Sequence, residues 1–493
     1  MNEHSGNELR IGWAARDVTP NRPVNLQGQF HMRISQGVKD PLTVTALALA
    51  DASGTDAAVF LSVDNAFITD RVMHGIRDAV RSQAPDLDTS KIIANSTHTH
   101  TAPMLEDGMY PPVPPGVMTG KEYADFFIER AAQALVEAWR GCGKATVAWG
   151  LGQAVVGRNR RAVYFDDLSK RSGHKDRPGH CTTRFARMYG NSNDPMFSHI
   201  EGYEDHSVDL LYTWNARDEL SGVIVNLACP SQETEELSVV SADCWHEIRC
   251  EIRRRLGPNV FVLPQCAAAG DQSPHLLYYK AAQKRMLDLQ GIDMRVEIGR
   301  RVAQAVEETL AIACKDRRDS MPLRHIVKEI QLPRRLITAQ EAELIRSDIA
   351  ALERQAPSLN PDPAKQLQDA ARIVALKRCR LGLERYERQA QDPSVPVEVH
   401  AIRLGEVAVV TNPFELFLDY GIRIKARSPS IQTFIVQLAM SGAGWDGCYL
   451  PTVRAEQGES YSANMYCNSV GSAGGQALVE ETLAMLADLW QDA

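Results

Sequence analysis

The sequence has few of the features that would place the protein in a membrane or on a nucleic acid. It has no run of about 18 apolar residues, so a membrane-spanning helix is not expected. Its net charge is −8 and it has no extended basic run, which argues against nucleic acid or an anionic membrane as a partner. The expected partner is therefore a small-molecule substrate, and the sequence leaves a homo-oligomer open.

The sequence also predicts neither paired cysteines nor a secretory leader. The ten cysteines are scattered, with no Cys-x-x-Cys pair. The opening residues MNEHSGNELR have no basic segment followed by an apolar one, as a secretory signal would. We therefore expect reduced, mostly buried thiols and a cytoplasmic protein.

What remains is an ordinary globular composition, with 44% hydrophobic and 24% charged residues in 493. Strand patterns alternate with helical ones; the strand at 59–64, the helix at 70–83 and the strand ending at 94 predict a β-α-β unit. We predict an α/β fold, with a mixed-sheet core and outer helices, that forms one catalytic domain over residues 1–493. Two long charged helices at 338–355 and 363–391 interrupt this pattern, and we interpret residues 335–396 as a helical-hairpin insertion.

The most informative stretch is KIIANSTHTHTAP, residues 91–103. An apolar strand end passes into small polar residues and then into His98 and His100. Residues at i and i+2 of an extended chain point to the same side, so both imidazoles can face one cleft at the mouth of a sheet. Imidazole is the commonest zinc ligand among side chains, although two histidines hydrogen-bonded in a loop would give the same pattern.

Several short phrases together resemble the neutral/alkaline, non-lysosomal ceramidase family, whose members are zinc amidohydrolases. The phrase THTHTAP is similar to the family's THTHSGP, and GDQSP is similar to its GDVSP. The other matching phrases occur in the same order along the chain: NLACPSQE at 226–233, SADCWHE at 241–247, NPFELF at 412–417 and GWDGCYLPT at 444–452. The resemblance covers nearly the whole chain apart from the helical hairpin.

The resemblance implies one Zn²⁺ per chain, with His98 and Glu415 among its ligands. The family's second zinc histidine aligns with Pro230, which has no side-chain donor. We predict that His246, with or without Asp243, fills this gap, because residues three apart share one face of a helix turn. Alternatively, Asp243 is only the cap of the helix that follows it and His246 only a polar surface residue.

The resemblance also implies the catalytic groups. Ser273 in GDQSP matches the serine assigned as the family's nucleophile, and Tyr449 matches a metal-site tyrosine. His100, Ser273 and Tyr449 would supply proton transfer or contacts to an oxyanion. A turn with an aspartate-to-backbone bond would explain GDQSP equally well if it stood alone.

The expected function is zinc-dependent hydrolysis of a small soluble amide or ester. Ceramide itself fits less well, because the chain shows neither the secretory leader nor the C-terminal β-sandwich of the family. A glycoside is an alternative substrate. A catalytically inactive binding protein on the same scaffold is a further alternative, which Pro230 favours.

Overall fold

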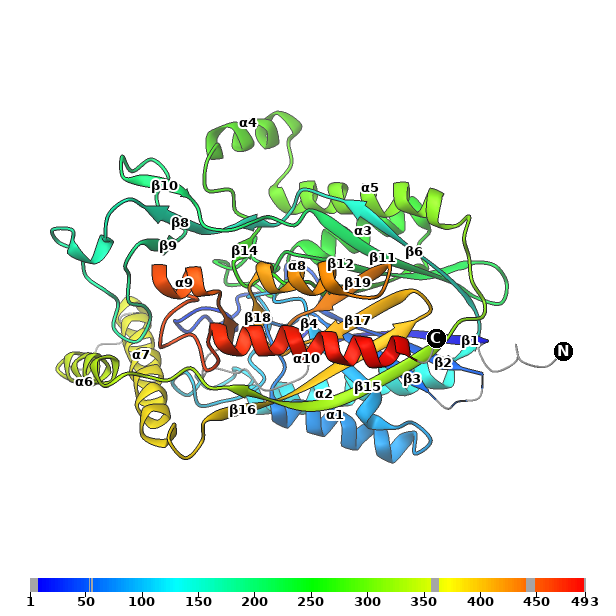
Figure 1. The fold of residues 1–493 in the computed structure, drawn as a ribbon, viewed down its shortest axis with the longest axis horizontal. Helices are drawn as coiled ribbons and strands as arrows, with labels where there is room; N and C mark the ends of the chain where they lie inside the picture. The colour runs from blue at the N-terminus through cyan, green and yellow to red at the C-terminus, as the bar shows by residue number, and fades with distance from the viewer. Residues whose placement is uncertain (1–7, 53, 55, 356–362, 440–447, 492–493) are drawn as a thin grey trace.

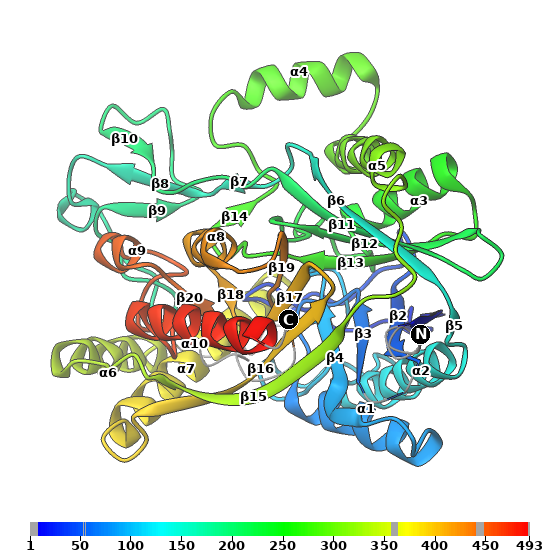
Figure 2. The same ribbon diagram turned by 45° about the vertical axis from the view of Figure 1, so that its right-hand side comes forward.

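The computed structural model describes residues 8–52, 54, 56–355, 363–439 and 448–491. Three sheets with helices on their outer sides make up most of this part (Figures 1 and 2). No helix in these ranges is both long and apolar enough to cross a bilayer.

The first sheet has the order β4-β3-β2-β1-β5, and two helices cover its outer face. Its strands pair antiparallel except for β3 and β4, which are parallel as a β-α-β connection requires. The elements are β1 (Leu9–Asp17), β2 (Thr43–Asp51), β3 (Ala57–Val63), β4 (Ile92–Ser96), β5 (Gly143–Lys144), α1 (Asp70–Gln83) and α2 (Gly120–Arg140).

The second sheet has the order β13-β12-β11-β6 and is covered by α3 and α5. Its elements are β6 (Thr146–Gln153), β11 (Ser207–Trp214), β12 (Leu220–Leu227), β13 (Phe261–Cys266), α3 (Cys244–Leu256) and α5 (Met294–Ala313). Between β13 and α5, the helix α4 (Lys280–Gln290) stands away from the body in both views.

The third sheet has the order β15-β16-β17-β19 and is covered by α8 and α10. Its elements are β15 (Leu323–Pro333), β16 (Ser394–Leu404), β17 (Val407–Thr411), β19 (Gln432–Val436), α8 (Leu418–Arg427) and α10 (Ser472–Gln491).

The inner faces of the three sheets meet in one shared apolar core. Phe60 of β3, Leu211 of β11 and Val409 of β17 belong to it, whereas the next residues along these strands, Leu61 and Val410 among them, face the outer helices. This alternation follows from the two-residue period of a strand. Because both faces are buried, the strands are apolar almost throughout. The predicted α/β fold with a mixed-sheet core and outer helices is confirmed.

Most of the remaining elements gather at one end of the body, on the left in Figure 1. They include α6 (Ala339–Glu353) and α7 (Pro363–Arg388), which lie between β15 and β16 where the sequence predicted two long helices. The link between these helices lies outside the described residues. The short elements are β7 (Arg158–Asn159), β8 (Arg161–Tyr164), β9 (Ala186–Met188), β10 (Phe197–Ile200), β14 (Gln272–Ser273), β18 (Glu415–Leu416), β20 (Tyr449–Leu450), α9 (Val453–Gly458) and the 3₁₀ turns Thr89–Lys91 and Leu168–Lys170.

Candidate active site

The two histidines follow the end of β4 and both are buried. The backbone amide of His98 donates to the carbonyl of Asn65, so the turn is fixed to the end of the neighbouring strand β3. His98 has φ of 64°, a left-handed conformation that costs a non-glycine residue free energy and is often found at functional sites. The two Nε2 atoms nevertheless lie 3.2 Å apart, so the rings meet although the backbone at His98 is not the extended chain on which the prediction rested.

The ring of His98 is held in one orientation from both sides. Its Nδ1 lies 2.8 Å from the carbonyl of Ala66, which can only accept, so Nδ1 carries the proton. Its Nε2 lies 3.2 Å from Oε2 of Glu415. Burial alone would lower the pKa of His98, but the carboxylate of Glu415 raises it above its usual value. A cation would therefore bind at Nε2, in place of the proton that Glu415 favours there.

Glu415 and Tyr449 are paired residues of two short parallel strands, β18 and β20. Burial alone would raise the pKa of Glu415, yet His98 and Arg160 lower it to about 2, so the carboxylate is charged. Cys448 donates its thiol to the other oxygen of Glu415, at 3.0 Å. The structure thus places Tyr449 beside Glu415, in the register that the sequence motif implied.

Arg160 joins the groups around Glu415 and is almost fully buried. Its guanidinium donates to the carbonyl of Gly270 at 2.9 Å and to the Tyr449 hydroxyl at 3.1 Å. It also donates to Oε1 of Gln232 at 3.2 Å, and it lies 3.9 Å from Oε2 of Glu415. The positive charge of Arg160 therefore compensates a carboxylate that burial would otherwise destabilise.

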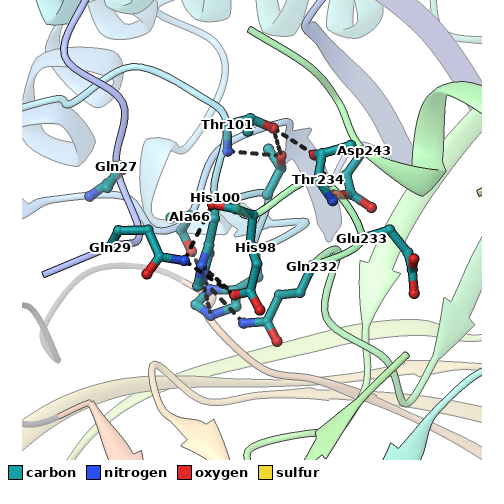
Figure 3. A network of polar contacts seen from close by, with 12 residues as sticks. Gln27, Gln29, Ala66, His98, His100, Thr101, Gln232, Glu233, Thr234 and Asp243 are labelled. Atoms are coloured by element: carbon teal, nitrogen blue, oxygen red, sulfur yellow. Dashed lines mark hydrogen bonds and ion pairs between the residues drawn. The ribbon is translucent and has the colours of Figure 1, made fainter. Parts of the chain in front are cut away.

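His100 is surrounded by groups from the segment after β12. The amide of Gln232 lies 3.2 Å from its Nε2 (Figure 3). Oε2 of Glu235 lies 3.2 Å from its Nδ1, although this nitrogen makes no hydrogen bond with proper geometry. Burial lowers the pKa of His100 below its usual value despite Glu235, which favours the neutral imidazole. On its other side the ring packs against Gly28, where an added Cβ would lie 2.3 Å from Cγ of His100.

Ser273 lies deeper than the other predicted catalytic residues. It is fully buried, pairs with Arg158 of β7, and its Oγ accepts from the backbone amide of His275 at 3.2 Å. Ser273 does not line the main cavity, whereas Tyr189, whose side chain interacts with Ser273, does.

The structure does not bring Asp243 and His246 to the histidine pair. Asp243 caps α3, as the sequence predicted, and accepts from the amides of Cys244 at 2.6 Å and Thr234 at 2.5 Å. In Figure 3 it lies beside Thr234 and Thr101, away from the rings of the pair. His246 is one turn further along, with Nε2 3.6 Å from Sγ of Cys250. Both carboxylate oxygens of Asp243 are thus already used, Oδ1 in capping α3 and Oδ2 in holding the loop that carries Gln232 and Glu235.

Sequence analysis missed Gln232 and Glu235, which take the places next to His100. They lie in a loop without periodicity, so no pattern identifies them. The only available signal was their position, two and five residues after the proline that replaces the expected histidine.

The donor atoms partly fit a bound metal ion. Nε2 of His98 is 3.2 Å from Nε2 of His100 and 3.2 Å from Oε2 of Glu415. Two ligand atoms about 2.05 Å from a tetrahedral zinc are about 3.3 Å apart. Within the described residues, however, no group of three or more His, Cys, Asp or Glu side chains has the full geometry of a metal site. The site therefore has pairs of donor atoms at separations that suit zinc, but the described residues do not form a complete set of zinc ligands.

Two cavities meet at this cluster. A small one of about 60 Å³ is lined by His98, His100, Glu415 and Tyr449, together with other residues. A larger one of about 580 Å³ reaches His100, Arg160 and Tyr449 at its inner end. The larger volume lies within the usual range for small-molecule sites.

No family model and no curated protein matches the sequence. Among solved structures, the neutral ceramidase from Pseudomonas aeruginosa is similar with a TM-score of 0.66 and 15% identity, over 98% of this chain and 75% of that one. A structure described as ceramidase complexed with C2 is similar with a TM-score of 0.65 and 14% identity over the same shares. The chain therefore has the neutral ceramidase fold over nearly its whole length, as its sequence motifs predicted.

Proposed function

We propose that the protein is a metal-dependent hydrolase that acts on a small soluble amide or ester. The observation that supports this most is the meeting of His98, His100 and Glu415 around a small cavity, where His100 also lines the adjoining cavity of about 580 Å³. The similarity of the fold to neutral ceramidase supports the same reaction class.

In this proposal His98 and Glu415 hold a zinc ion, and His100 lies beside it. A bound zinc would polarise the scissile carbonyl and lower the pKa of a bound water to roughly 7. The carbonyl of Ala66 orients His98 by fixing its tautomer, as such partners of metal-binding histidines do. His100 is neutral and buried, which suits a group that accepts a proton.

Arg160 and Tyr449 are proposed to stabilise negative charge on the substrate oxygen. Burial raises the pKa of Tyr449 well above its usual value, so its hydroxyl keeps its proton and can donate it in a hydrogen bond. Arg160 fixes the position of that hydroxyl at 3.1 Å. Donors that are already oriented before the reaction are the most effective at stabilising an oxyanion.

Ser273 remains a proposed nucleophile or oxyanion donor. Because it is fully buried and absent from the cavity lining, a step at its Oγ requires neighbouring side chains to move. We retain it because its hydroxyl is fixed next to the main cavity on the short strand β14, which pairs with the strand that leads into Arg160.

Elemental analysis of the purified protein tests the metal. We expect about one zinc per wild-type chain and a loss of at least about tenfold in zinc affinity for His98→Ala. His246→Ala is the matched control: the contacts of His246 predict unchanged zinc affinity, whereas the sequence-based replacement hypothesis predicts a loss.

A panel of soluble amides, esters and glycosides then tests the reaction. Hydrolysis of an amide or ester that disappears in His98→Ala supports the proposal. Wild-type protein that takes up no metal even after zinc is added, and hydrolyses nothing in the panel, contradicts it and favours the inactive binding protein.

A further inference from the structure

The mouth of the large cavity is more basic than the protein as a whole. The chain carries a net charge of −8, yet the cavity is lined by four cationic side chains, Arg160, Lys175, Arg177 and Arg187, and by two acidic ones, Glu235 and Glu236. Glu235 already lies against His100, and Arg160 against Glu415. Among the described residues, the lining charges left outside these pairs are three cations, Lys175, Arg177 and Arg187, and one carboxylate, Glu236, so a net positive charge remains.

These three cations differ from the other arginines of the same segment. Arg171 pairs with Asp166 and Asp194, and Arg184 lies 3.8 Å from Glu459. By contrast, Lys175, Arg177 and Arg187 make no ion pair with any residue in the ranges that the structure describes. All three are exposed at the cavity, so their charges are available to a ligand.

Further inside, the cavity presents polar groups without partners. His180 is 6% exposed, lines the cavity, and has an Nδ1 that makes no hydrogen bond with the described residues. Burial, with Arg378 and Arg177 nearby, lowers its pKa to about 3, so the imidazole is neutral and can donate one hydrogen bond. The hydroxyl of Tyr189 is likewise buried and makes no hydrogen bond of good geometry with the described residues, although it lies close to Arg160 and Ser273. Unpaired buried donors of this kind are costly unless a ligand satisfies them.

We propose that the substrate is an anionic amide or ester, with a carboxylate or similar acidic group that binds Lys175, Arg177 and Arg187 while the scissile carbonyl reaches His100 and Arg160. This rests on the proposed function for the position of the scissile bond, but the anion site follows from the cavity alone. Cations gathered along one cleft attract an anion more strongly than the same charges scattered over an open surface. His180 and Tyr189 then complete the binding by donating hydrogen bonds.

Equilibrium binding tests the anion site without requiring turnover. The probes are N-acetyl-L-alanine, which carries a carboxylate, and N-acetyl-L-alaninamide, its neutral counterpart of nearly the same shape. We expect the wild-type protein to bind the carboxylate about tenfold more tightly, since each of three accessible ion pairs contributes modestly. The preference should fall as sodium chloride is raised from about 0.05 M to about 0.5 M.

The triple variant Lys175→Gln, Arg177→Gln, Arg187→Gln should lose the preference and bind both probes alike. These side chains are exposed, so the variant should fold normally. Arg184→Gln is the matched control, because Arg184 is an exposed arginine of the same segment that does not line the cavity, and it should keep the wild-type preference.

Equal binding of both probes by the wild-type protein, or an unchanged preference in the triple variant, overturns the anion site. Neither result affects the proposed hydrolase, which a neutral substrate would still support. Conversely, a clear preference for the carboxylate without any hydrolysis would support the anion site and count against the proposed reaction.

Discussion

Replacing Gly28 by alanine should displace His100 and so inactivate the site. Gly28 has φ of 99°, and an added Cβ would lie 2.3 to 2.7 Å from three atoms of His100. Carbon atoms in contact are about 3.5–4.0 Å apart, so the ring must shift by roughly 1 Å or more. A misplacement of about 1 Å at a reacting centre can cost roughly 10²-fold in rate.

Stability should fall as well, by two separate contributions. The left-handed backbone conformation costs an alanine about 1–3 kcal/mol. Overpacking against the buried imidazole adds about 1–3 kcal/mol. Urea unfolding measures the sum, and kcat on the substrate found in the panel measures the displacement.

Gly108→Ala is the control that separates the two contributions. Gly108 has φ of 106°, but an added Cβ there would meet nothing within 4 Å. It should show the backbone cost alone, with full activity. If Gly28→Ala and Gly108→Ala have the same activity and the same unfolding free energy, the packing of Gly28 against His100 does not position that ring.

Three further predictions concern other parts of the site. Burial and neighbouring carboxylates raise the pKa of Glu233 from 4.5 to about 8. Because the folded chain holds this proton more tightly than the unfolded chain, stability falls as pH rises from about 4.5 to about 8. Glu233→Gln should therefore raise the unfolding free energy above pH 8 by on the order of 2 kcal/mol and change it little below pH 4.5. Ser273→Ala should lower kcat roughly 10²-fold with unchanged zinc content. Full activity of this variant would show that GDQSP is only a structural turn. Arg378→Met should lower the unfolding free energy by about 3 kcal/mol, because the buried guanidinium donates to two backbone carbonyls; Arg380→Met, at an exposed ion pair with Glu353, should cost less than about 1 kcal/mol.

Sequence patterns predicted well those parts of the site that strand ends position. His98 and His100 meet because both follow the end of β4, and Glu415 reaches them from a short strand beside the third sheet. The N-cap role of Asp243 was also predictable, since a short acidic side chain can accept from the first amides of a helix. In each case the end of a strand or the start of a helix determines where the side chain leaves the backbone.

The surroundings of His100 could not be predicted in the same way. The spacing of Asp243 and His246 places them on one face of a helix turn, but it does not say what that face contacts. The structure turns Asp243 toward Thr234 and His246 toward Cys250. Gln232 takes the position beside His100 because the loop after β12 folds back, and tertiary contacts alone determine its path.

The helical hairpin α6–α7 has a consequence for how this scaffold can change. β15 and β16 remain paired up to Pro333 and Ser394, so a short turn could join them without altering the sheet. The hairpin also holds other segments in place: Arg378 of α7 donates to the carbonyl of Gly179, next to the cavity residue His180, and to the carbonyl of Tyr466, which lines the small cavity. Exchanging or trimming this one segment would reshape the space offered to a substrate while the two histidines and their partner carboxylate stay where they are.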